Sequence, residues 1–115
     1  MKLQQQFQQL IATPSVSSVN PDFDMGNRAV IDLLATWCEE AGFNVEIQPI
    51  PGYPHKANLI AVKGTGEGGL VLSGHTDTVP CNESLWASNP FQATERGGKL
   101  YGLGSTDMKS FLAIA

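Results

Sequence analysis

Apolar residues recur at helical spacing at the start of the chain, over residues 2–12. The apolar positions on this face are Leu3, Phe7, Leu10 and Ile11. Their spacing matches 3.6 residues per turn and predicts an amphipathic helix. Thr13-Pro14 ends it, because proline pushes the residue before it out of the helical region.

A second apolar stripe follows a polar loop. Its members are Val30, Ile31, Leu34, Trp37, Cys38 and Ala41. This stripe predicts a helix that is capped by Asp22 or Asp24 and runs to about residue 41. Gly42 then supplies the left-handed conformation in which many helices end.

The period changes from helical to alternating after this helix. Residues 43–49 alternate apolar and polar side chains, which predicts a strand with one solvated face. Three prolines predict a stiff loop over 49–55. The short apolar runs 58–62 and 70–73 are typical of strands that are buried on both faces.

The rest of the chain combines an irregular loop with short elements. Residues 76–90 are predicted to form that loop, and 91–94 with 99–101 a small hairpin turning at Gly97-Gly98. Helix alternates with strand over most of the chain, so the predicted fold class is α/β, with a mixed sheet flanked by helices. A last apolar helical pattern begins at Met108 and runs to Ala115 without a stop signal, so residues 1–115 are expected to be the N-terminal part of a longer domain.

Composition and charge narrow the function classes. Hydrophobic residues make up 42% and charged residues 16% of the chain, which is typical of globular proteins. The net charge of −4 and the scattered lysines and arginines argue against a nucleic acid or an anionic membrane as partner. No apolar run suits a signal peptide or a membrane span, and the two cysteines form no Cys-x-x-Cys pair, so a cytoplasmic location is expected.

One glycine pattern imitates a nucleotide site. Residues 64–69 satisfy the spacing G-x-G-x-x-G, but a predicted strand follows them where a dinucleotide site needs a helix. We interpret them as a flexible turn.

Two short stretches carry the candidate chemistry. The first, Leu72–Pro80, places His75 and Asp77 two residues apart at the end of a predicted strand, where both side chains point to one side. A metal-ligating histidine needs such a carboxylate on its second nitrogen, although a purely structural His–Asp pair is an open alternative.

The second stretch is a glycine-rich turn, Gly102–Lys109, with Asp107 at the start of the last predicted helix. Imidazole nitrogen and carboxylate oxygen are common zinc ligands, which makes Asp107 and His75 candidate partners. The alternative for Asp107 is a helix cap, because unpaired N–H groups favour a carboxylate at this place.

The wording of both stretches resembles the M20 metallopeptidase family. The matching motifs are Ser-Gly-His-Thr-Asp-Thr-Val-Pro (73–80), Trp86 with Pro90-Phe91, and Leu-Tyr-Gly-Leu-Gly-Ser-Thr-Asp-Met-Lys (100–109). The resemblance covers essentially the whole chain. It implies the fold of a dizinc aminopeptidase/carboxypeptidase-like catalytic domain, of which residues 1–115 are the N-terminal portion.

The resemblance also implies roles for three residues. His75 would ligate one metal ion and Asp107 would bridge two, most simply Zn²⁺ or Co²⁺, while Asp77 would be the catalytic carboxylate that orients His75. The family's general-base glutamate and its remaining ligands would lie beyond residue 115. Residues 1–115 alone are therefore expected to be inactive.

The implied activity is removal of the acyl group from a small N-acyl amino acid. The motif wording is similar to the branch of the family that converts N2-acetylornithine to ornithine and acetate in arginine biosynthesis, as a homodimer. Leu103 stands where many members carry arginine, which weakens the hypothesis of N-succinyl-diaminopimelate as substrate. Dipeptide hydrolysis and a non-catalytic binding module on the same scaffold are two further hypotheses.

Three further residues are assigned by their surroundings. His55 is predicted to be a solvated side chain in a proline-rich loop, and Lys109 is predicted to lie on the helix surface. Cys81 is an alternative nucleophile, but the metal hypothesis accounts for more residues.

Overall fold

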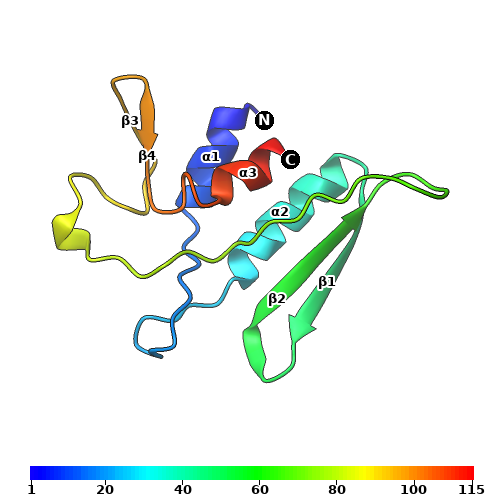
Figure 1. Ribbon diagram of the computed structural model, residues 1–115, viewed down its shortest axis with the longest axis horizontal. Helices are drawn as coiled ribbons and strands as arrows, with labels where there is room; N and C mark the ends of the chain where they lie inside the picture. The colour runs from blue at the N-terminus through cyan, green and yellow to red at the C-terminus, as the bar shows by residue number, and fades with distance from the viewer.

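The computed structural model describes residues 1–115 as helices and strands linked by long loops (Figure 1). The helices are α1 (Leu3–Ile11), α2 (Arg28–Glu40), α3 (Lys109–Ile114) and one 3-10 turn, η1 (Glu83–Leu85). The strands are β1 (Asn44–Ile50), β2 (Tyr53–Val62), β3 (Thr94–Arg96) and β4 (Lys99–Tyr101). The α/β class is therefore confirmed, and all three predicted helices are present.

A small core joins the helices to the first sheet. Leu10 of α1 and Val30 of α2 are fully buried, and Leu34 completes the cluster with them. Leu59 of β2 and Leu112 of α3 pack against this cluster. Helix α2 thus lies against the β1–β2 pair, while α1 and α3 lie beside each other (Figure 1).

Helix α2 begins later than its sequence pattern predicted. It starts at Arg28, so the predicted cap at Asp22 or Asp24 is wrong. Asp24 instead accepts a hydrogen bond from the Ser18 N–H at 2.9 Å and pairs with the Lys56 ammonium at 2.9 Å. This carboxylate ties the loop before α2 to β2, and such a long-range contact leaves no trace in local spacing.

Low pH is expected to weaken the contacts that the Asp24 carboxylate makes with Ser18 and Lys56. The Ser18 N–H and then the Lys56 ammonium lower the pKa of Asp24 below its ordinary value of 3.8. The folded-state pKa thus lies below that of the unfolded chain, so the contribution of Asp24 to stability is present above the unfolded value and disappears as pH falls through the folded one. Asp24→Asn is expected to flatten this part of the acid dependence in urea denaturation followed from neutral pH downwards.

Asp22→Asn is the control, because the Asp22 carboxylate forms no ion pair. Parallel pH profiles for Asp24→Asn and the wild type would contradict the expectation.

Strands β1 and β2 form an antiparallel pair in which Asn44 lies opposite Val62. The predicted loop over 49–55 is wrong at both ends, since β1 continues to Ile50 and β2 already starts at Tyr53 and contains Pro54. Proline is tolerated there because its missing N–H falls on a strand without a second neighbour.

The predicted burial of the two apolar runs on both faces is also wrong. Residues 58–62 belong to β2, but Ile60 is 42% and Val62 54% exposed, because α2 covers only the opposite face of this strand, on which Leu59 lies. Residues 70–73 form no strand, and Leu70 and Val71 are 84% and 89% exposed. No strand of the chain pairs with them, so their backbone groups have no ladder to join.

The second sheet is the predicted hairpin, but its first strand lies at Thr94–Arg96 rather than at 91–94. β3 pairs with β4 through Gly97-Gly98, and both glycines have positive φ values, +60° and +72°, as a tight hairpin turn requires. The sheets are thus two antiparallel pairs, and parallel pairing is limited to one bridge between Val16 and Thr78.

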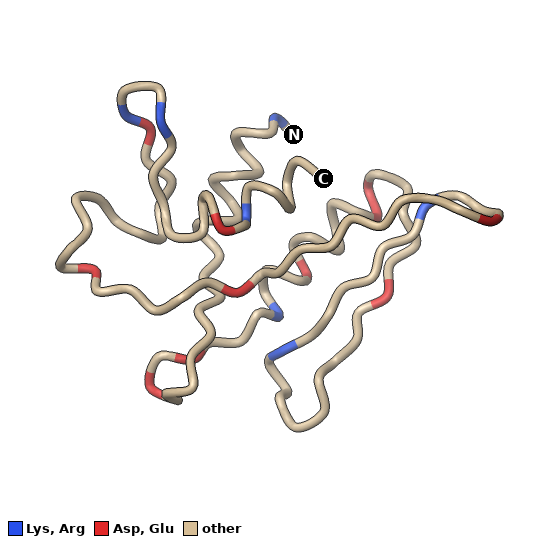
Figure 2. The backbone as a smooth tube through the Cα atoms, in the orientation of Figure 1, with Lys and Arg blue, Asp and Glu red and all other residues tan.

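Charged groups are dispersed over the molecule. Figure 2 shows lysine and arginine at separate places rather than on one face. None of the helices has the length and apolar character needed to cross a lipid bilayer.

Candidate active site

The segment that carries His75 and Asp77 is held by the loop after α1. Ser17 N–H donates to the Thr78 carbonyl at 2.9 Å, and Thr78 N–H donates to the Ser15 carbonyl at 3.1 Å. This short parallel ladder fixes the backbone immediately after both site residues.

Asn27 holds the same segment from the other side. Its Nδ2 donates to the Ala57 carbonyl at 2.9 Å and to Thr76 Oγ1 at 3.0 Å, and its Oδ1 accepts the Ala57 N–H at 2.8 Å. Asn27 thus links the start of α2, strand β2 and the residue between His75 and Asp77. This role was not predicted from the sequence, because Asn27 fell inside the helix that was expected to start at Asp22 or Asp24.

The three predicted site residues come together around the His75 imidazole. Its Nδ1 lies 3.1 Å from both the backbone oxygen and the Oδ1 of Asp77. Its Nε2 lies 3.0 Å from Oδ1 of Asp107, a residue 32 positions further along the chain. The imidazole is therefore held between two carboxylates, one on each nitrogen.

Asp107 is not a helix cap. The position before α3 is occupied by Met108, and no side chain caps the first turn of that helix. The Asp107 carboxylate is 83% exposed and its only hydrogen-bond partner is His75. The alternative assignment of Asp107 as a cap is therefore wrong.

The two carboxylates also set the charge of the imidazole. Desolvation disfavours the charged form, but the carboxylate and backbone oxygen of Asp77 and then the carboxylate of Asp107 outweigh it and raise the pKa of His75 above its ordinary value of 6.5. The raised pKa favours a protonated imidazole. A cation that binds Nε2 must displace the proton from that nitrogen, so cation binding is coupled to proton release.

Lys109 is buried, contrary to the predicted surface position. Its side chain is 2% exposed, and its Nζ donates to the carbonyls of Leu10 at 2.9 Å and Thr13 at 2.7 Å. Burial lowers the pKa of Lys109 to about 8. The prediction failed because both acceptors lie almost a hundred residues earlier in the chain.

An open cleft of about 1000 Å³ reaches the site. It runs between β2, α2 and the segment 70–77, and both His75 and Asp77 line it. A substrate that occupies this cleft would therefore lie beside the imidazole.

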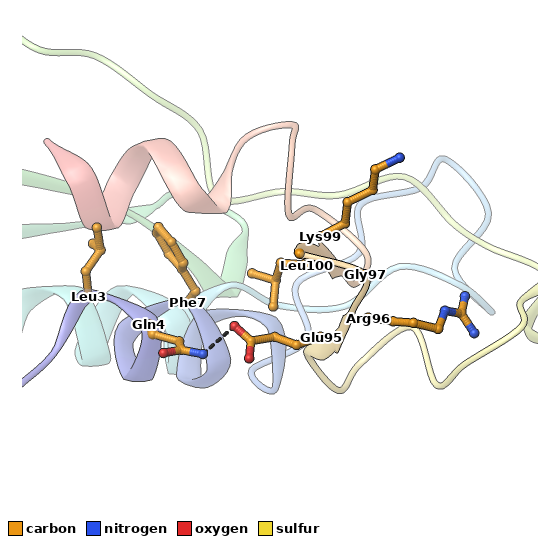
Figure 3. A pocket seen from close by; sticks show the side chains of 9 residues that line it. Leu3, Gln4, Phe7, Glu95, Arg96, Gly97, Lys99 and Leu100 are labelled. Atoms are coloured by element: carbon orange, nitrogen blue, oxygen red, sulfur yellow. Dashed lines mark hydrogen bonds between the residues drawn. The ribbon is translucent and has the colours of Figure 1, made fainter.

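A separate pocket of about 580 Å³ lies between α1 and the β3–β4 hairpin (Figure 3). Leu3, Phe7 and Leu100 form its apolar part, and a hydrogen bond from Gln4 to Glu95 crosses its edge. None of the three predicted site residues lines this pocket, so the candidate chemistry belongs to the larger cleft.

Cys81 fits the role of nucleophile poorly. Burial and then the nearby Glu83 carboxylate raise the pKa of its thiol, which disfavours the reactive thiolate. No hydrogen bond joins Cys81 to the imidazole of His75.

The donor atoms of His75 and Asp107 fit a shared divalent cation. Two ligands that each stand ~2.1 Å from a tetrahedral zinc ion lie roughly 3.4 Å apart, so the observed 3.0 Å between Nε2 and Oδ1 needs only a small outward shift of the exposed Asp107 carboxylate to admit the ion. Asp77 on Nδ1 gives the imidazole the carboxylate support that metal-bound histidines have. Since no group of three or more possible ligands converges in the chain, the residues present account for part of such a site.

Comparison with known proteins agrees with this donor set. The sequence pattern of peptidase family M20/M25/M40 matches residues 71–115, which include His75, Asp77 and Asp107. The chain is 56% identical to acetylornithine deacetylase from Photorhabdus laumondii over 94% of its length, and 55% identical to acetylornithine deacetylase from Proteus mirabilis over 94%. The chain belongs to the M20 peptidase family.

A solved structure shares the fold of this M20 chain. Human carnosine dipeptidase 1 matches 97% of the chain with a TM-score of 0.81 and 25% sequence identity. The M20 chain spans 28% of the length of both deacetylases and 28% of the dipeptidase chain.

Proposed function

We propose that the protein is a metal-dependent amidohydrolase that converts N2-acetylornithine to ornithine and acetate, a step of arginine biosynthesis. The observation that carries the proposal is the His75 imidazole held between Asp77 and Asp107 at hydrogen-bonding distance. The identities of 52–56% to acetylornithine deacetylases support the choice of substrate.

Residues 1–115 form the N-terminal portion of the metal-dependent catalytic domain in this proposal. The coverage of 28% of each relative supports it. The exposed apolar side chains of Leu70 and Val71 support it as well, because the remainder of a domain would cover them.

His75 and Asp107 are the proposed metal ligands, through Nε2 and a carboxylate oxygen. Zinc or cobalt, two ions in the complete site, would supply Lewis-acid polarisation of the amide carbonyl when bound. Asp77 is the proposed orienting carboxylate: it accepts the proton of Nδ1, which would leave the Nε2 lone pair available to a metal ion shared with Asp107.

The substrate and setting follow the same proposal. A small N-acyl amino acid would enter the cleft lined by His75 and Asp77, and the protein would act in the cytoplasm as a homodimer. Dipeptide hydrolysis is the second candidate activity, favoured by the structural match to human carnosine dipeptidase 1.

The test is release of acetate from N2-acetylornithine by the full-length protein. Chelator-treated protein is expected to be inactive and to recover when zinc or cobalt is added, and Asp107→Ala is expected to prevent recovery. Carnosine and N-succinyl-diaminopimelate are the comparison substrates. Faster hydrolysis of carnosine would replace the deacetylase with a dipeptidase, and activity that persists without metal would refute the proposal.

A further inference from the structure

Lys109 carries an ammonium group into the interior without an acidic partner. It takes part in no ion pair, and its Nζ binds only the carbonyls of Leu10 and Thr13. These carbonyls lie in the last turn of α1 and just beyond it, where helix carbonyls lack intrahelical partners and carry partial negative charge. The ammonium therefore ties the start of α3 to the end of α1.

The chain that follows the end of α1 also holds the segment that carries His75. Residues 15–17, directly after Thr13, form the backbone ladder with Thr78 that fixes the segment of His75. Residues 10–17 therefore support both parts of the site. The segment of His75 is bound to them through backbone hydrogen bonds, and the turn that carries Asp107 is bound through the Lys109 side chain.

The position of Asp107 depends on this support. Its carboxylate has no hydrogen bond except the one to His75, so nothing else orients it. Its backbone belongs to the turn that the Lys109 N–H closes on the Gly104 carbonyl at 2.9 Å. Release of the ammonium would therefore free the turn that presents Asp107.

We propose that Lys109 is a positioning residue: its ammonium, bound to the carbonyls of Leu10 and Thr13, holds the turn at 104–109 so that the Asp107 carboxylate faces Nε2 of His75. The contact itself is a property of this chain. The use of the pair as metal ligands rests on the proposed function.

The contact can be followed in the metal-free full-length protein by the ¹⁵N signals of the His75 imidazole at constant pH. Asp107→Ala provides the signals of an imidazole that has lost this contact. Lys109→Met, which keeps the length of the side chain and removes its donors, is expected to shift the signals toward those of Asp107→Ala. Lys109→Arg keeps donors for both carbonyls and is expected to retain the wild-type signals.

Wild-type imidazole signals in a folded Lys109→Met protein would overturn the proposal. If Lys109→Met does not fold, the proposal is tested by Lys109→Arg alone. Imidazole signals of Lys109→Arg that match those of Asp107→Ala would then overturn the proposal.

Zinc affinity, measured by competition with a chelator, separates this proposal from the proposed function. Lys109→Met is expected to weaken zinc binding about tenfold or more in the wild-type background and to have no further effect on Asp107→Ala. An additive loss in both backgrounds would show a merely structural role and overturn the proposal. Equal zinc affinity of Asp107→Ala and the wild type would refute Asp107 as a ligand. The imidazole signals would still test whether Lys109 positions Asp107.

Discussion

Replacement of His75 by alanine is expected to lower the affinity of the full-length protein for zinc at least about 100-fold and to abolish metal-dependent release of acetate. The imidazole is the only group that binds both site carboxylates, so its loss removes one proposed ligand and the partner of the other. Chelator competition measures the affinity. His55→Ala is the matched control, because the His55 imidazole makes no hydrogen bond or ion pair and lies outside the site.

Asp77→Asn is expected to cause a smaller loss of zinc affinity. Asparagine can still accept the Nδ1 proton but carries no charge, so affinity should fall by roughly 10–100-fold, less than in His75→Ala. Zinc binding of His75→Ala at the wild-type level would refute His75 as a ligand.

Replacement of Gly104 by alanine is expected to destabilise the protein by about 3 kcal/mol. Gly104 has φ +83°, and an added Cβ would lie 2.7 Å from Cγ2 of Thr78, whose side chain is buried and cannot retreat. The left-handed backbone accounts for roughly 1–2 kcal/mol and the overlap for about 1–3 kcal/mol. Urea denaturation measures the loss.

Gly68→Ala is the matched control for the backbone term. Gly68 has nearly the same φ, +81°, but nothing lies within 4 Å of its added Cβ. The difference in free energy of unfolding between the two variants therefore isolates the overlap with Thr78. Equal destabilisation would mean that the turn at 104 moves freely, which would also weaken its proposed role in presenting Asp107.

Local elements were predictable from the sequence because their causes are local. The apolar spacing of residues 3–11 and the glycine pair at 97–98 determine a helix and a hairpin without help from distant residues. His75 and Asp77 were found for the same reason, since two residues in extended chain share a side. Asp107 was found through its motif, but the sequence did not decide whether it caps a helix or lies beside His75 as a metal ligand.

The errors with the largest effect on the fold and the site concern contacts between distant parts of the chain. Asp24 was assigned to a helix cap, whereas it pairs with Lys56. Residues 70–73 have the composition of a buried strand, but a strand also needs a neighbour to accept its hydrogen bonds. Composition reports what a segment can bury, and only the surrounding structure decides whether a partner is there.

Residue spacing and motif wording were enough to determine the three helices, the hairpin at 97–98 and the residue types of the site. Packing of the whole chain was needed to show that Asp107 faces His75 and that Lys109 is buried on the carbonyls of Leu10 and Thr13. The physical reason is the range of the interactions. Periodicity and turn chemistry act over a few residues, whereas these hydrogen bonds join groups 32 to 99 positions apart, which meet only after the chain has packed.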